Sequence, residues 1–120
     1  MTRRALFAVC LATALAWAGP AAAHAILVGS QPKEAAEVAG PDVDVSLEFN
    51  SRIDAARSSL QLSREGAEAT PLALGESAEP NKLAAKAAGL TPGAYRLRWQ
   101  VLSVDGHVSR GNVNFKVRAP

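Results

Sequence analysis

His24 and His107 are the only two imidazoles in the chain. His107 ends the segment SVDGH at 103–107, in which Asp105 precedes it by two residues. In an extended stretch, residues i and i+2 point to the same side, and Gly106 between them lets the backbone bend. A carboxylate and an imidazole placed in this way are metal donors. The same spacing is also typical of an ordinary turn, because Asp-Gly is a common turn former.

His24 gains a second donor if the chain is processed. Residues 1–23 read as a cleavable signal peptide, because Arg3 and Arg4 precede an apolar run and three alanines at 21–23 precede His24. Cleavage there makes His24 the first residue, and its α-amine and Nδ1 can then close a six-membered ring on one metal ion. The amine can lose its proton, since a free α-amine titrates at about 7.7–8.0.

Three nitrogens and one oxygen are the donors that His24, Asp105 and His107 offer together. In a tetragonal plane this set suits Cu(II). Met1 and Cys10 both lie in the predicted signal peptide, so residues 24–120 contain no thiolate or thioether of the kind that selects Cu(I). We therefore predict one Cu(II) per chain.

Charge and length narrow the class of protein further. Lys and Arg total 13 against 11 Asp and Glu, and two of the 13, Arg3 and Arg4, belong to the signal peptide. The balance that remains disfavours a nucleic-acid partner, and we interpret Arg96, Arg98, Arg110 and Arg118 as solvated strand faces. Residues 24–120 are long enough for one domain, which we expect to be a monomer.

Alternation of apolar and polar residues dominates residues 24–120 and predicts an all-β fold. The strongest strands are 43–49, 95–101 and 112–118, and weaker ones are 26–28, 59–62, 70–74 and 82–87. Seven short strands separated by turn signals favour a seven-stranded antiparallel Greek-key sandwich or barrel of the immunoglobulin-like kind. Residues 82–89 could instead form a helix capped by Gly89, although their length favours a strand.

The strands would also position the donors. Asp105 and His107 fall in or beside the connection between two consecutive strands, at one end of the sandwich, where binding residues usually lie. If the strand at 26–28 begins at that end, His24 can meet both of them. Trp99 lies on the inward side of its alternating strand, and we expect it in the core.

The chain resembles CopC-type periplasmic copper-resistance proteins in four segments. Residues 24–32 and 45–50 are similar to the opening of that family, and residues 90–99 and 103–111 are similar to its second half. The resemblance implies a seven-stranded Greek-key sandwich or barrel that binds Cu(II) through the mature N-terminal histidine and an Asp-x-His pair. In this sequence those ligands are His24, Asp105 and His107.

Two features depart from the family pattern. Some members have a glutamate near the copper, shortly after the phenylalanine of the second strand, whereas this chain has Ser51 there. Some members also carry a methionine-rich loop for Cu(I), which residues 24–120 lack.

The leading hypothesis is a non-enzymatic Cu(II) carrier or buffer in the periplasm. The resemblance implies a membrane copper-transport protein as its partner. A histidine-brace copper oxidase of the polysaccharide-monooxygenase type is the alternative, but Asp105 would occupy the position that oxygen needs. A third hypothesis is a sandwich module with no metal role, in which the place of His24 is a coincidence.

Overall fold

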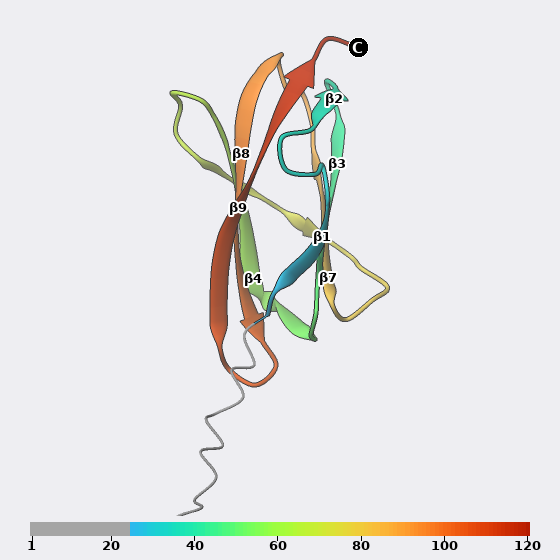
Figure 1. Cartoon of the computed structure of the whole chain (residues 1–120), viewed down its shortest axis with the longest axis vertical. Coiled ribbons are helices and arrows are strands. Elements are labelled where there is room, and N and C mark those ends of the chain that lie inside the picture. Colours follow the sequence, from blue (N-terminus) through green and yellow to red (C-terminus); the bar gives the residue numbers. More distant parts are fainter. Residues whose placement is uncertain (1–24) are drawn as a thin grey trace, which may run out of the picture.

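The computed structural model describes residues 25–120, and all its regular elements within that range are β-strands packed as two sheets (Figure 1). The four-stranded sheet has the order β1 (Leu27–Gln31), β3 (Val43–Phe49), β7 (Lys82–Ala87), β6 (Leu74–Gly75). The five-stranded sheet has the order β2 (Glu37–Ala39), β9 (Val108–Arg118), β8 (Gly93–Ser103), β4 (Ile53–Arg64), β5 (Thr70–Leu72). The predicted signal peptide and His24 lie outside the described residues. No helix within residues 25–120 is long and apolar enough to cross a membrane.

The predicted all-β class is confirmed, with nine strands among the described residues instead of seven. One added strand is β2, which pairs with β9 in parallel, whereas the prediction was wholly antiparallel. The other arises because the predicted strand at 70–74 is divided between the sheets: β5 pairs with β4, and β6 pairs with β7. Residues 82–87 form strand β7, as predicted, and not a helix.

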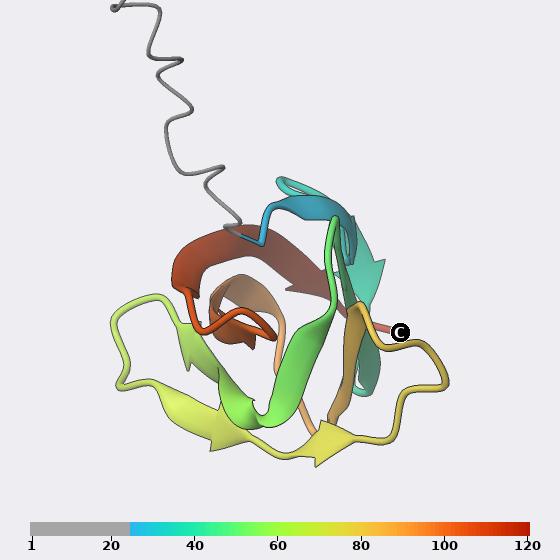
Figure 2. The ribbon, with the colours of Figure 1, turned by 90° about the horizontal axis from the view of Figure 1, so that it is seen from below.

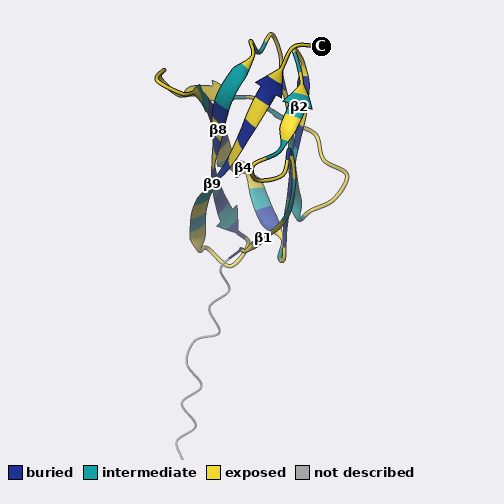
Figure 3. Ribbon diagram, turned by 45° about the horizontal axis from the view of Figure 1, so that its top comes forward, coloured by how far each residue is buried: buried dark blue, intermediate teal, exposed yellow. Residues whose placement is uncertain are grey.

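The core lies between the sheets and follows the alternation of the sequence. In β3, Val43, Val45, Leu47 and Phe49 are all buried, and the residues between them are not. The same alternation runs along β8 and β9 (Figure 3). Trp99 is buried as predicted and meets Phe49 edge to face, with ring centroids 5.2 Å apart.

One end of the sandwich gathers the three segments that bear on the predicted site. The turn between β8 and β9, the start of β1 and the β3–β4 connection all lie at the lower end in Figure 1, which Figure 2 shows from below. The condition set by the sequence is therefore met: β1 begins at the same end as the turn that carries Asp105 and His107.

Candidate metal centre

Residues 104–107 form a tight turn between β8 and β9. Ser103, the last residue of β8, donates its amide to His107 O at 2.9 Å, and Gly106 donates its amide to Ser103 O at 2.9 Å. Gly106 has φ +94°, in the left-handed region that favours glycine. The Asp-Gly pair therefore serves the turn and at the same time sets Asp105 and His107 on the same loop.

Asp105 is held by donors from both sides of the turn. Its Oδ1 accepts a hydrogen bond from the Ser103 hydroxyl, another from the His107 amide at 3.3 Å, and lies 3.2 Å from His107 Nδ1. The bond from Ser103 is the main cause that lowers the pKa of Asp105. Desolvation, the next largest effect, raises the pKa, and the contacts with His107 lower it further. Asp105 is therefore a carboxylate at neutral pH.

The contact between the two side chains also assigns the ring nitrogens of His107. Because Nδ1 faces Asp105, Nε2 points away from that contact as the other donor nitrogen of the imidazole. A carboxylate that fixes a histidine ring in this way is common around metal ions. Asp105 still has Oδ2 with which to approach a metal.

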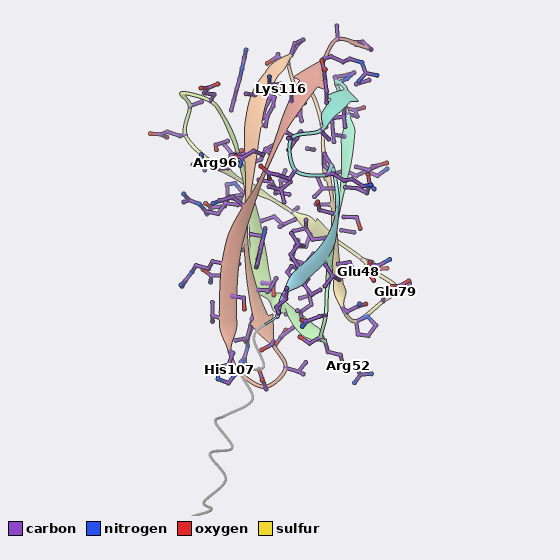
Figure 4. The ribbon with its side chains drawn as sticks, in the orientation of Figure 1. Glu48, Arg52, Glu79, Arg96, His107 and Lys116 are labelled. Carbon is purple, nitrogen blue, oxygen red and sulfur yellow. The ribbon has the colours of Figure 1, made fainter. Side chains whose placement is uncertain are left out.

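The β3–β4 connection ties the start of the described chain to this turn. Asn50 Oδ1 accepts a hydrogen bond from Ile26 N at 2.8 Å, and Asn50 N donates to Ile26 O at 2.9 Å. Two residues on, Arg52 O accepts the amide of Val104 at 3.3 Å. Ile26 and Val104 are thus linked through one short connection, and Figure 4 shows Arg52 and His107 at this same end.

The three predicted ligands have different outcomes. Asp105 and His107 are in contact, as the motif predicted. His24 lies outside the described residues, so its part in the site stays a prediction. Within residues 25–120, no group of three His, Cys, Asp or Glu side chains is placed to hold a metal ion. A metal at Asp105 and His107 would therefore need another donor. The described chain begins next to His24, at Ala25, which is buried.

Ser51 lies in the β3–β4 connection, at the site end. Its hydroxyl is buried and makes no hydrogen bond within the described part of the chain. A short hydroxyl therefore stands where some relatives were expected to have a carboxylate, and it gives the site no second acidic group.

Two supporting residues were not identified from the sequence. Ser103 holds Asp105, and its position two residues before an Asp-Gly turn could have suggested this, because serine hydroxyls often bond within turns. Asn50 pairs with Ile26 across 24 positions of sequence, and no local pattern indicates such a contact.

Comparison with known proteins agrees with this architecture. Residues 27–118 match the family model described as the CopC domain. The chain belongs to the CopC family. Copper resistance protein C of Xanthomonas campestris pv. juglandis is 35% identical over 125 residues, which cover 92% of this chain and 91% of the relative. Family membership links this CopC-family chain to copper resistance.

Two solved structures extend the likeness to the fold. CopC from Methylosinus trichosporium OB3b has a TM-score of 0.74 and 28% identity, covering 80% of this chain and 95% of that one. PcoC, a methionine-rich copper resistance protein from Escherichia coli, has a TM-score of 0.69 and 27% identity, covering 80% and 100%. The contrast with PcoC is in composition, because Met1 is the only methionine of this CopC-family chain.

Proposed function

We propose that this CopC-family chain binds one Cu(II) as cargo, through His24, Asp105 and His107, and carries or buffers it in the periplasm. The observation that carries the proposal is the contact between Asp105 and His107 in a turn at the end where β1 begins. His107 supplies one ring nitrogen and Asp105 one carboxylate oxygen. The amine and Nδ1 of a processed His24 supply the other two nitrogens.

The linkage between Ile26 and the turn supports the reach of His24. Ile26 is fixed to Asn50 by two hydrogen bonds, and the same connection is bonded to Val104. His24 is only two residues before Ile26, and a residue spans at most about 3.6 Å of extended chain. The N-terminal histidine therefore has a short, tethered path to Asp105 and His107.

The donor set favours a carrier of Cu(II) over an oxidase or a Cu(I) protein. Asp105 fills an equatorial position that an oxidase would leave open for oxygen. Thioether and thiolate donors are absent from residues 24–120, so the soft ligands that select Cu(I) are missing. Delivery of the copper to a membrane transport protein completes the proposed role.

The proposal is tested by Cu(II) titration of protein that begins at His24, beside the same protein with the α-amine of His24 acetylated. Acetylation removes the amine as a donor and leaves every described residue unchanged. We expect one Cu(II) per chain in the first protein and at least ~tenfold weaker binding in the second, since a chelating donor is lost. Equal affinities would reject ligation by the amine.

Export and processing are tested separately. Mass spectrometry of the secreted protein is expected to give His24 as the first residue. A different first residue would remove the proposed chelate, whatever the affinity of the protein prepared for titration.

A further inference from the structure

Charged side chains are arranged differently on the outer faces of the two sheets. On the four-stranded sheet, each acid of β3 has a lysine of β7 opposite it: Asp44 pairs with Lys86, and Glu48 with Lys82. On the five-stranded sheet, β8 and β9 contain five basic residues and no acidic one. Opposite charges in direct register stabilise a sheet, so the first face is compensated within the fold. On the second face only Lys116 has an acid opposite it, Glu37 of β2.

Four of these basic residues form a continuous line, here called the cationic strip: Arg110, Arg98, Arg96 and Lys116. All four are exposed, and Arg96, Arg98 and Lys116 alternate with buried neighbours, whereas the neighbours of Arg110 are half-buried. Arg98 stands opposite Asn112, and Gln100 opposite Arg110, so the basic residues zigzag across the β8–β9 ladder. From Arg110 to Lys116 the strip runs six residues, or about 20 Å.

The hydrogen bonds that the arginines of the strip donate go only to neutral side chains. Arg96 Nε donates to Asn114 Oδ1 at 3.2 Å, and Arg110 Nε donates to Gln100 Oε1 at 2.7 Å. Arg98 makes no hydrogen bond or ion pair with any residue in the range 25–120. Together Arg98 and Arg110 line an open groove whose other polar groups are a serine, three amides and the indole N–H of Trp99, which is buried and has no hydrogen-bond partner within the described residues. Planar guanidinium groups in such a groove are suited to carboxylate or phosphate oxygens.

Acidic side chains flank the Arg96–Lys116 end of the strip, where Glu37 of β2 stands opposite Lys116 and Glu65 lines the same hollow. Glu34 accepts two hydrogen bonds from Asn114, at 2.8 and 3.1 Å. Asp54 of β4 lies 3.8 Å from Arg57, its own ion-pair partner. Figure 4 shows Arg96 and Lys116 over β8 and β9, and Glu48 on the other side of the molecule. The middle of the strip, at Arg98 and Arg110, is thus its least compensated part.

Copper is not the ligand that this surface would attract, because basic groups repel a dication. Nucleic acid is disfavoured since every aromatic side chain in the described range is buried, which leaves no platform for stacking bases. A membrane surface is disfavoured because basic groups that bind lipid are usually accompanied by apolar side chains that enter it, and the strip has none. A protein surface rich in carboxylates satisfies the remaining requirements.

We propose that the cationic strip is a docking surface for an acidic protein partner. The strip reaches toward the candidate metal centre, because Arg110 is three residues from His107. A partner lying on Arg98 and Arg110 would therefore also reach the turn that carries Asp105. This last step, in which docking serves copper transfer, rests on the proposed function; the docking itself does not.

The test measures binding of fluorescently labelled poly-L-glutamate to the processed protein, by anisotropy, in low salt. The variant is Arg98→Gln/Arg110→Gln, and the matched control is Lys82→Gln/Lys86→Gln, which removes the same charge from the compensated face. We expect the arginine pair to weaken binding at least ~tenfold and the lysine pair to change it less than ~threefold. Added salt is expected to weaken binding by the wild type. Equal losses in the two variants, or no binding by the wild type, would overturn the proposal.

Two further arms distinguish the class of partner. Vesicles containing phosphatidylglycerol and a single-stranded oligonucleotide are each expected to bind more weakly than poly-L-glutamate. Tighter binding to either one would overturn the assignment to an acidic protein. Cu(II) titration of both variants is expected to match the wild type. If the wild type binds poly-L-glutamate and not Cu(II), the proposed copper function fails and the docking surface stands.

Discussion

The two ends of the sandwich are closed by different kinds of contact. At the upper end, Tyr95 donates its hydroxyl to Thr91 O at 2.7 Å, and Arg64 bonds both Thr91 Oγ1 and Pro92 O. At the lower end, the contacts of the turn converge on one titratable pair, Asp105 and His107. The upper end joins loops to strands, whereas the lower end orients two donor groups.

The two ends of the sandwich also differ in the apolar side chains that they expose. The exposed large hydrophobic residues in the described range are Ile26, Val28, Val104 and Val108. Ile26 and Val28 lie just before and within β1, Val104 begins the 104–107 turn, and Val108 begins β9. Stability at the upper end and chemistry at the lower end should therefore respond to different substitutions. The predictions below test that separation.

The largest effect is expected from His107→Ala. It removes one nitrogen donor and the contact with Asp105, so we expect Cu(II) affinity to fall by at least ~100-fold, the upper range for loss of a supporting group. His107 is more than half exposed, and the free energy of unfolding of the metal-free protein should change by less than ~0.5 kcal/mol. Cu(II) titration and urea denaturation check the two parts. A large loss of stability with unchanged Cu(II) affinity would show that His107 supports folding and not metal binding.

Ser103→Ala should have an intermediate effect, through positioning. The hydroxyl of Ser103 bonds Asp105 and also His107 O at 3.0 Å, so its loss loosens the turn that holds both donors. We expect Cu(II) affinity to fall ~tenfold, as for other groups that orient ligands. Ser59→Ala, on the exposed face of β4, is the control and should leave affinity unchanged. The same loss in both variants would contradict a positioning role.

Tyr95→Phe should affect the other end alone. The substitution removes one half-buried hydrogen bond, and we expect the free energy of unfolding to fall by about 1 kcal/mol. The packing of the ring on Phe115 is retained, so the strands should keep their register. Cu(II) affinity is expected to equal that of the wild type. A weaker affinity in this variant would mean that the two ends are coupled.

The smallest effect is expected on the pH dependence of folding stability at acidic pH. The pKa of Asp105 is lowered in the folded chain, so its contribution to stability is complete above the unfolded value of about 3.9 and is lost as pH falls through the folded value. Asp105→Asn should therefore change the slope of stability against pH only below about pH 4. Thermal melts between pH 3 and 7 measure this slope. A difference in slope between the two proteins above pH 5 would contradict the assigned direction.

Local pattern was enough to predict the strands whose faces alternate regularly. The ranges 43–49 and 82–87 are β3 and β7 with unchanged bounds, because each has one buried and one exposed face. The predicted strand at 59–62 is longer, Ile53–Arg64, because a register shift between Asp54 and Ser59 interrupts the alternation. β2 was missed since three residues carry too little pattern, and its pairing with β9 depends on distant residues.

The site was predictable in part for the same reason. Asp105 and His107 are near in sequence, and the turn brings them together. The cationic strip was not predictable from composition, because the balanced count of charges conceals their separation. Only the register of β8 with β9 places Arg98 diagonally beside Arg110, on two strands that contain no acidic residue.

Electron paramagnetic resonance of the protein that begins at His24, loaded with one equivalent of Cu(II), is the most direct test of the central claim. Three nitrogens and one oxygen in a tetragonal plane should give one axial Cu(II) signal with coupling to nitrogen. The coupling should decrease in His107→Ala and should stay unchanged in Tyr95→Phe. A Cu(II) signal identical in wild type and His107→Ala would contradict a copper site at the lower end.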